Sequence, residues 1–194
     1  MGSMSEQMAR ARHRITASDY YRMAEAGILG AADRVELIDG EIMDMAPIGS
    51  KHAFIVSRLA RFFTLASNDN YLVSTQNPVR LDELSEPQPD LALLKPGNYM
   101  DRLPGPADVL LIVEVAQSSI NFDREVKLTL YARHGIPEVW LLDLADGELA
   151  VYREPVDGQY RVMRKPSASE SISPLLVPDV DLRLEVGKSW SVPF

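Results

Sequence analysis

The sequence predicts an α/β domain in which helices flank a central mixed β-sheet. Two runs, Val109–Ala116 and residues 139–143, are apolar and rich in branched side chains, as in strands that are buried on both faces. Between them, residues 121–134 carry apolar side chains at helical spacing and end at Gly135. A helix between two buried strands indicates a crossover connection within one sheet.

The composition indicates one acidic globular domain. The 194 residues are 46% hydrophobic, which is enough material for one buried core. Because the chain has no cysteines, disulfides, zinc fingers and thiol catalysis are excluded. No apolar run reaches the roughly 20 residues that a membrane span requires, so we expect a cytoplasmic protein with no membrane partner.

The charge pattern separates a short N-terminal arm from the rest of the chain. Residues 1–15 are polar and basic, begin with a tag-like tetrapeptide, and are expected to be disordered. A single domain is expected over residues 16–194. The net charge of −8 lacks the basic excess of proteins that coat DNA. Binding of nucleic acid would therefore require a local basic patch, or a metal that bridges carboxylates to phosphate.

The first elements are a helix over residues 16–26 and a β-hairpin. Asp39-Gly40 stands between two alternating runs, 34–38 and 41–45, and an Asp-Gly pair in this position is a strong signal for a two-residue turn. Such a turn pairs position 36 with 43 and position 38 with 41, because the strands are antiparallel. One face of the hairpin then carries four side chains: Glu36, Ile38, Glu41 and Met43.

The remaining elements follow from periodicity and from turn residues. We expect a helix over residues 50–66, with Ser50 as its cap, and the connecting helix over 121–134. Strands are expected over residues 71–75, 78–82, 90–94, 109–116, 139–143, 148–153 and 159–164, with a weak late strand around 180–186. The segments 83–88 and 95–108 are expected to be loops.

Two carboxylates are expected to meet in the centre of this sheet. If strands 90–94 and 109–116 are antiparallel with Leu94 opposite Leu110, then Asp90 lies opposite Glu114. Two adjacent carboxylates repel each other unless a divalent metal holds them. Hard oxygen ligands of this kind suit Mg²⁺ or Mn²⁺ rather than zinc.

The connecting helix offers a cation to this carboxylate pair. Asp123, Lys127 and Tyr131 are spaced four residues apart and therefore share one helix face. A helix that packs back on the sheet after Glu114 could direct Lys127 toward the carboxylates. A lysine in that position could orient an attacking water while the metal activates it.

The ordered set of these residues resembles the PD-(D/E)xK nuclease signature. More narrowly, the chain is similar to the Uma2 family, also called DUF820, of restriction-endonuclease-like proteins, over roughly residues 16–185. The match is carried by Tyr20-Tyr21, residues 35–41, Ala46-Pro47, His52, residues 89–92, residues 112–115, Asp123, Lys127, Tyr131-Ala132, Gly135 and residues 138–143.

This resemblance implies a restriction-endonuclease-like domain that cuts DNA as a Mg²⁺-dependent endonuclease, with a homodimer as the expected assembly. It assigns the metal to Asp90 and Glu114. Hairpin geometry leaves Glu36 and Glu41 about equal, and the resemblance selects Glu36 as the third acidic residue. Lys127 matches a catalytic lysine that has moved from the strand to the next helix, because the usual position two residues after Glu114 is Ala116.

Simpler interpretations stay open at this point. Glu114 could be a strand-end carboxylate in a salt bridge, and Lys127 could be a solvated helix residue. His52 is expected to be a structural or surface histidine rather than a ligand, and Tyr131 and Trp140 are expected to be core residues. The alternatives to a DNA nuclease are an inactive binding or accessory module with the same fold, and a metal-dependent hydrolase of a smaller phosphate ester.

Overall fold

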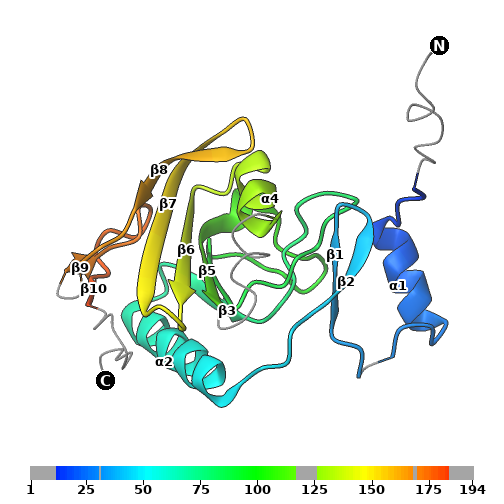
Figure 1. Ribbon diagram of the computed structural model, residues 1–194, viewed down its shortest axis with the longest axis horizontal. Coiled ribbons are helices and arrows are strands. Elements are labelled where there is room, and N and C mark those ends of the chain that lie inside the picture. The colour runs from blue at the N-terminus through cyan, green and yellow to red at the C-terminus, as the bar shows by residue number, and fades with distance from the viewer. Residues whose placement is uncertain (1–11, 31, 117–125, 168–169, 184–194) are drawn as a thin grey trace, which may run out of the picture.

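A six-stranded mixed sheet forms the centre of the protein in the computed structural model (Figure 1). The structure describes residues 12–30, 32–116, 126–167 and 170–183. The strands lie in the order β3 (Leu72–Thr75), β4 (Leu91–Leu94), β5 (Val109–Ala116), β6 (Glu138–Asp143), β7 (Glu148–Val156) and β8 (Gln159–Arg164). The predicted α/β class with a mixed sheet is confirmed.

The two central strands, β5 and β6, are the only parallel neighbours among these six, and every residue of both is buried. Parallel neighbours require a crossover, because the chain must return to the same end of the sheet. That crossover contains α4 (Leu128–Arg133). The first part of the predicted helix, residues 121–125, lies outside the described residues.

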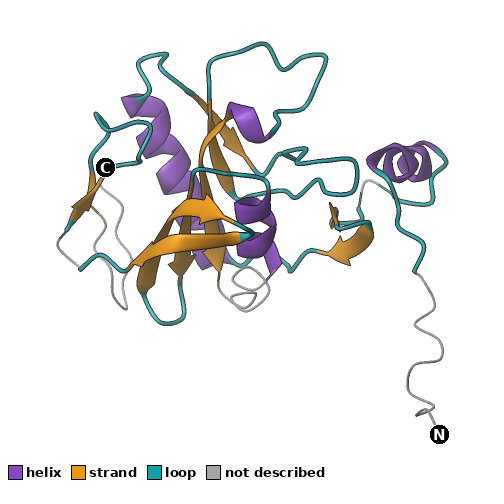
Figure 2. Ribbon diagram, turned by 90° about the horizontal axis from the view of Figure 1, so that it is seen from above, coloured by secondary structure: helices purple, strands orange, loops and turns teal. Residues whose placement is uncertain are grey.

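Helices cover the two faces of the sheet (Figure 2). The helix α2 (Ser50–Ala66) packs Phe63 against Trp140 of β6, with ring centroids 6.1 Å apart. On the other face, the buried side chains of α4 belong to the same apolar cluster as Ile112 and Ala116 of β5. Because side chains alternate along a strand, Glu114 is directed toward the α4 face. The Glu114 carboxylate is therefore buried on the α4 side of the sheet.

The N-terminal elements form as expected. The helix α1 (Ala17–Glu25) is capped by Thr16, whose hydroxyl accepts a hydrogen bond from the Asp19 amide at 3.1 Å. The strands β1 (Val35–Ile38) and β2 (Glu41–Asp44) pair in the predicted register. Gly40 has φ of +77°, and a Cβ on this residue would lie 2.6 Å from the Cβ of Arg14, so the turn requires glycine.

The hairpin is attached to the rest of the domain through the segment that precedes β4. The amide of Glu86 donates to the Leu37 carbonyl at 2.7 Å, and the amide of Gly40 donates to the Leu84 carbonyl at 2.7 Å. The Ser85 hydroxyl also accepts a hydrogen bond from the Asp39 amide. These bonds fix the position of β1 and hence of Glu36.

The pairing of β4 with β5 follows the expected register only in part. Leu91 lies opposite Val113, as predicted, but Leu94 lies opposite Val109 rather than Leu110. The register shifts because the amide of Lys95 donates to the carbonyl of Asp108, at the end of a 3₁₀ turn (Pro106–Asp108). Asp90 precedes the first paired residue of β4, so it is not a ladder partner of Glu114.

Three smaller predictions were wrong or incomplete. Residues 78–82 form no strand, because the amides of Val79 and Arg80 donate to the loop carbonyls of Pro87 and Pro104. The cap of α2 is Gly49 rather than Ser50, which is the first helical residue. The late strand is the short β10 (Leu182–Arg183), which pairs with an unpredicted β9 (Ser171–Ile172), and residues 184–186 lie outside the described part.

Among the described residues, no helix is long and apolar enough to cross a membrane.

The packing of α2 on the sheet gives a stability prediction. We expect Phe63→Ala to lower the free energy of unfolding by about 3–5 kcal/mol, because Phe63 is fully buried and its removal leaves a cavity. Phe54→Ala, on the exposed side of the same helix, should change it by less than about 0.5 kcal/mol. Urea unfolding measures both variants. Equal losses would contradict the packing of α2 described above.

Candidate functional site

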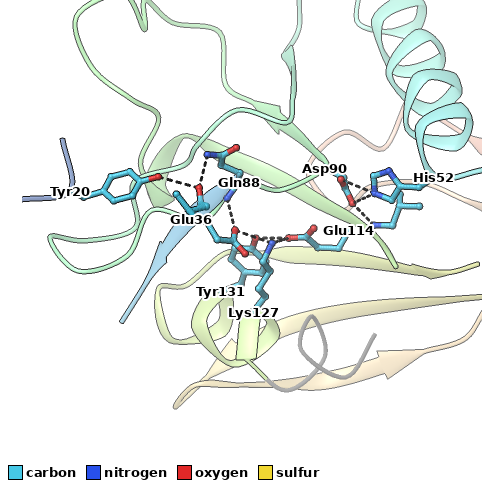
Figure 3. Close-up of polar contacts among 10 residues, drawn as sticks. Tyr20, Glu36, His52, Gln88, Asp90, Glu114, Lys127 and Tyr131 are labelled. Atoms are coloured by element: carbon cyan, nitrogen blue, oxygen red, sulfur yellow. Dashed lines mark hydrogen bonds and ion pairs between the residues drawn. The ribbon is translucent and has the colours of Figure 1, made fainter. Parts of the chain in front are cut away.

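A buried lysine joins two elements that are far apart in the sequence (Figure 3). The Nζ atom of Lys127 lies 3.1 Å from Oε2 of Glu36 and 3.5 Å from Oε1 of Glu114. The Tyr131 hydroxyl donates to the same Glu114 oxygen at 2.6 Å. We call these four residues, Glu36, Glu114, Lys127 and Tyr131, the lysine cluster.

The lysine cluster is almost completely removed from solvent. Glu36, Glu114 and Lys127 are 3%, 4% and 5% exposed, and Tyr131 is fully buried. Buried charges are tolerated only when they are paired and hydrogen-bonded, because each one loses its hydration. Here the lysine compensates both glutamates at once, and the Tyr131 hydroxyl adds a hydrogen bond to Glu114. The cluster is therefore held in one arrangement.

Local structure positions Lys127, Tyr131 and Glu36 in the lysine cluster. Lys127 and Tyr131 stand four residues apart at the start of α4 and share one helix face, as the spacing predicts. Glu36 receives a second hydrogen bond from the Gln88 amide at 3.0 Å. Of the two hairpin glutamates, Glu36 is the buried one that joins the lysine cluster, whereas Glu41 is exposed and pairs with Arg12.

A polar network around Glu86 holds the strand that carries Glu36. The Tyr21 hydroxyl donates to Oε1 of Glu86 at 2.5 Å, and Nε of Arg80 donates to Oε2 at 2.8 Å. Burial and the hydrogen bond to Glu86 raise the pKa of Tyr21 to about 12, so this phenol stays protonated at neutral pH. Because the Glu86 amide is bonded to β1, the network holds the strand from which Glu36 projects.

Asp90 directly precedes β4, and its hydrogen-bond partners are not members of the lysine cluster. Its carboxylate accepts a hydrogen bond from the Val115 amide at 2.8 Å. Since β4 begins only at Leu91, the side chain of Asp90 takes the place that a strand carbonyl would occupy in the next rung of the ladder. This hydrogen bond fixes the Asp90 carboxylate next to Val115, at the point where β4 begins.

His52 is the second partner of Asp90. Its Nε2 atom lies 3.0 Å from both carboxylate oxygens, and only 13% of the imidazole is exposed. A carboxylate can only accept, so Nε2 is the donor, which leaves Nδ1 buried without a hydrogen-bond partner among the described residues. Sequence reasoning undervalued His52, because the contact depends on how the first turn of α2 meets the end of β4.

The oxygen atoms that could hold a divalent metal belong to Asp90, Glu114 and Glu36. Within the described part of the chain, no three acidic or histidine side chains are grouped so that they could hold a metal alone. Lys127 lies between the two glutamates, and Asp90 is directed toward His52. Mg²⁺, however, usually keeps several waters and needs only one or two carboxylates together with substrate phosphates. Asp90 bonds to the amide of Val115, the residue that directly follows Glu114 in β5, so these two carboxylates are the candidates for such a site.

Comparisons with known proteins agree with this fold. The model of the Uma2 family, described as "Putative restriction endonuclease", matches residues 17–186. A solved structure of a "putative nuclease belonging to DUF820" from Anabaena variabilis is similar with a TM-score of 0.68 and 15% sequence identity. The similarity covers 87% of this chain and 94% of that one. No curated protein matches the sequence.

The shared cation of the lysine cluster gives a testable coupling. We expect Lys127→Met to lower the free energy of unfolding by about 3–5 kcal/mol at neutral pH, because it leaves two buried glutamates without their common lysine. Adding Glu36→Gln should recover part of that loss. A double-mutant cycle by urea unfolding measures the coupling. Strictly additive effects would contradict a direct ion pair between Lys127 and Glu36.

Proposed function

The chain belongs to the Uma2 family, described as "Putative restriction endonuclease", and from this premise we propose that it is a Mg²⁺-dependent nuclease that hydrolyses DNA phosphodiester bonds. The observation that supports the proposal is the lysine cluster. Two acidic side chains and a lysine, from the hairpin, the central strand and the crossover, converge at one point. A fold that needed only stability would gain as much from apolar side chains there.

In the proposed site, Asp90 and Glu114 would hold the metal and Glu36 would assist them. When bound, Mg²⁺ would lower the pKa of a water molecule and polarise the phosphate. His52 and the Val115 amide keep the Asp90 carboxylate oriented. Tyr131 keeps one oxygen of Glu114 bonded, which limits the rotation of that side chain.

Lys127 carries the second part of the proposed chemistry. Hydrolysis joins the oxygen of a water molecule to phosphorus and breaks the bond to the leaving oxygen, which takes up the proton that the water releases; negative charge increases on the phosphate oxygens during this step. The ammonium group of Lys127, held by Glu36 and Glu114, orients the water and offers positive charge to those oxygens. The position two residues after Glu114, where the nuclease signature has its lysine, is the fully buried Ala116. In this proposal Lys127 takes the role of that lysine.

One observation favours a second candidate, an inactive binding or accessory module. The Asp90 carboxylate already has two partners in the protein, His52 and the Val115 amide. A carboxylate that serves only to close the end of β4 would look the same. This alternative predicts no metal binding and no turnover.

Cleavage assays distinguish the two candidates. We expect the protein to nick or cut plasmid DNA in Mg²⁺ or Mn²⁺, and Asp90→Asn, Glu114→Gln and Lys127→Gln each to lower the rate by about 100-fold or more. The matched variants of exposed residues, Asp101→Asn and Lys95→Gln, should keep the wild-type rate. Thermal unfolding verifies that every variant is folded.

The outcomes separate clearly. Cleavage that survives Asp90→Asn and Lys127→Gln would reject the proposed site. Absence of cleavage together with absence of Mg²⁺ binding in calorimetry would favour the accessory module.

Cutting of both strands at one place calls for two sites, so the homodimer stays a prediction that sedimentation velocity can test.

His52 gives an independent test of the metal assignment. We expect His52→Ala to weaken Mg²⁺ binding by about tenfold or more in calorimetry, because Asp90 loses the group that orients it. His52→Gln, which can still donate a hydrogen bond, should restore part of the affinity. If both variants bind Mg²⁺ as tightly as the wild type, His52 does not position Asp90 as a metal ligand.

A further inference from the structure

A pocket of about 590 Å³ lies beside the lysine cluster. It is lined by Arg12, His13, Arg14, Ile38, Asp39, Glu41, Met43 and Val126. The hairpin face that presents Glu36 also presents Ile38 and Met43, and Val126 directly precedes Lys127. The pocket and the lysine cluster are therefore neighbours on the same face of the hairpin.

Three consecutive residues of the N-terminal arm supply nitrogen donors to the pocket. Arg12, His13 and Arg14 are all exposed, and the arm is fixed where it passes the hairpin turn. The Ile15 amide donates to the Gly40 carbonyl at 2.9 Å, and the Arg14 side chain lies against Gly40. The donors are thus held beside the pocket by backbone contacts.

The charges that face the pocket are only partly compensated within the protein. Asp39 pairs with Arg133, and Glu41 pairs with Arg12 at 2.9 Å. The Arg12 pair is exposed and therefore weak, so Arg12 can exchange partners. Within the described residues, no carboxylate lies within ion-pair distance of Arg14. A guanidinium in this situation suits a phosphate, which it can bind through two parallel hydrogen bonds.

The remaining lining residues narrow the class of ligand. The volume lies in the range of small-molecule sites, about 300–1,000 Å³. A bare phosphate or polyphosphate would leave the apolar side of the pocket, formed by Ile38, Met43 and Val126, unused. A nucleotide uses every part, because its base packs on apolar side chains while the amino groups of the base donate to carboxylates such as those of Asp39 and Glu41.

We propose that this pocket holds one unstacked nucleotide of the DNA strand that is cut at the lysine cluster. The inference rests on the proposed function and adds a substrate class to it. A base that enters the pocket cannot be stacked inside a duplex at the same time. The preferred substrate is therefore single-stranded DNA, or a duplex that is opened next to the cut.

Binding measurements test the pocket without any cleavage. A fluorescein-labelled oligonucleotide, as a single strand and as the matched duplex, is titrated with the full chain in EDTA, and anisotropy is recorded. We expect the single strand to bind more tightly than the duplex. Arg14→Gln should weaken its binding by about fivefold, because one phosphate contact is lost. Met43→Trp, which fills the pocket, should weaken it similarly.

Two matched variants serve as controls for these substitutions. Arg61→Gln removes an exposed arginine from α2, and Met163→Trp adds the same bulk to an exposed position on β8. Neither variant should change the affinity for the single strand. Thermal unfolding establishes that all four variants are folded before binding is compared.

The results separate this inference from the proposed function. If Arg14→Gln and Met43→Trp bind the single strand as well as the wild type, or if the control variants lose as much, the pocket assignment is overturned. Cleavage with unchanged kcat and KM in both pocket variants would overturn it too, while the nuclease proposal stands. Tight, pocket-dependent binding without cleavage in Mg²⁺ would support the pocket as a nucleotide-binding site but reject the nuclease, and with it the claim that the bound strand is the one that is cut.

Discussion

The ion pairs of Lys127 with Glu36 and Glu114 are the interaction on which the arrangement of three segments depends. The hairpin, the central strand β5 and the crossover into α4 contribute one charged side chain each. None of the three could be buried alone, because an isolated charge in an apolar interior is too costly. The segments must therefore dock together, and the geometry of the site is a consequence of that docking.

The end of β4 imposes a second constraint on the same region. β5 extends beyond the residues that pair with β4, and the Val115 amide donates its hydrogen bond to the side chain of Asp90. His52 then completes the bonding of that carboxylate from α2. As a result, the Asp90 carboxylate is held between Val115 of β5 and His52 of α2.

The hairpin is the element that links the site to the N-terminal region. It forms a separate two-stranded sheet, and it is attached through the segment before β4 and through the contacts of Glu86. Tyr21 and Arg80 bond both oxygens of Glu86, and the Glu86 amide bonds to Leu37, so these contacts hold β1 against the segment before β4. The same hairpin carries Glu36, and its Ile38 and Met43 side chains line the pocket.

The sequence alone determined the elements whose signals are local. Alternation and an Asp-Gly turn fixed the hairpin register, apolar runs identified β5 and β6, and four-residue spacing placed Lys127 and Tyr131 on one helix face. Only the tertiary structure decided that Lys127 pairs with Glu36 as well as Glu114, and that Asp90 bonds His52 instead of lying opposite Glu114. Those contacts join residues from 13 to 91 positions apart, and they depend on how helices and loops dock, which local periodicity does not encode.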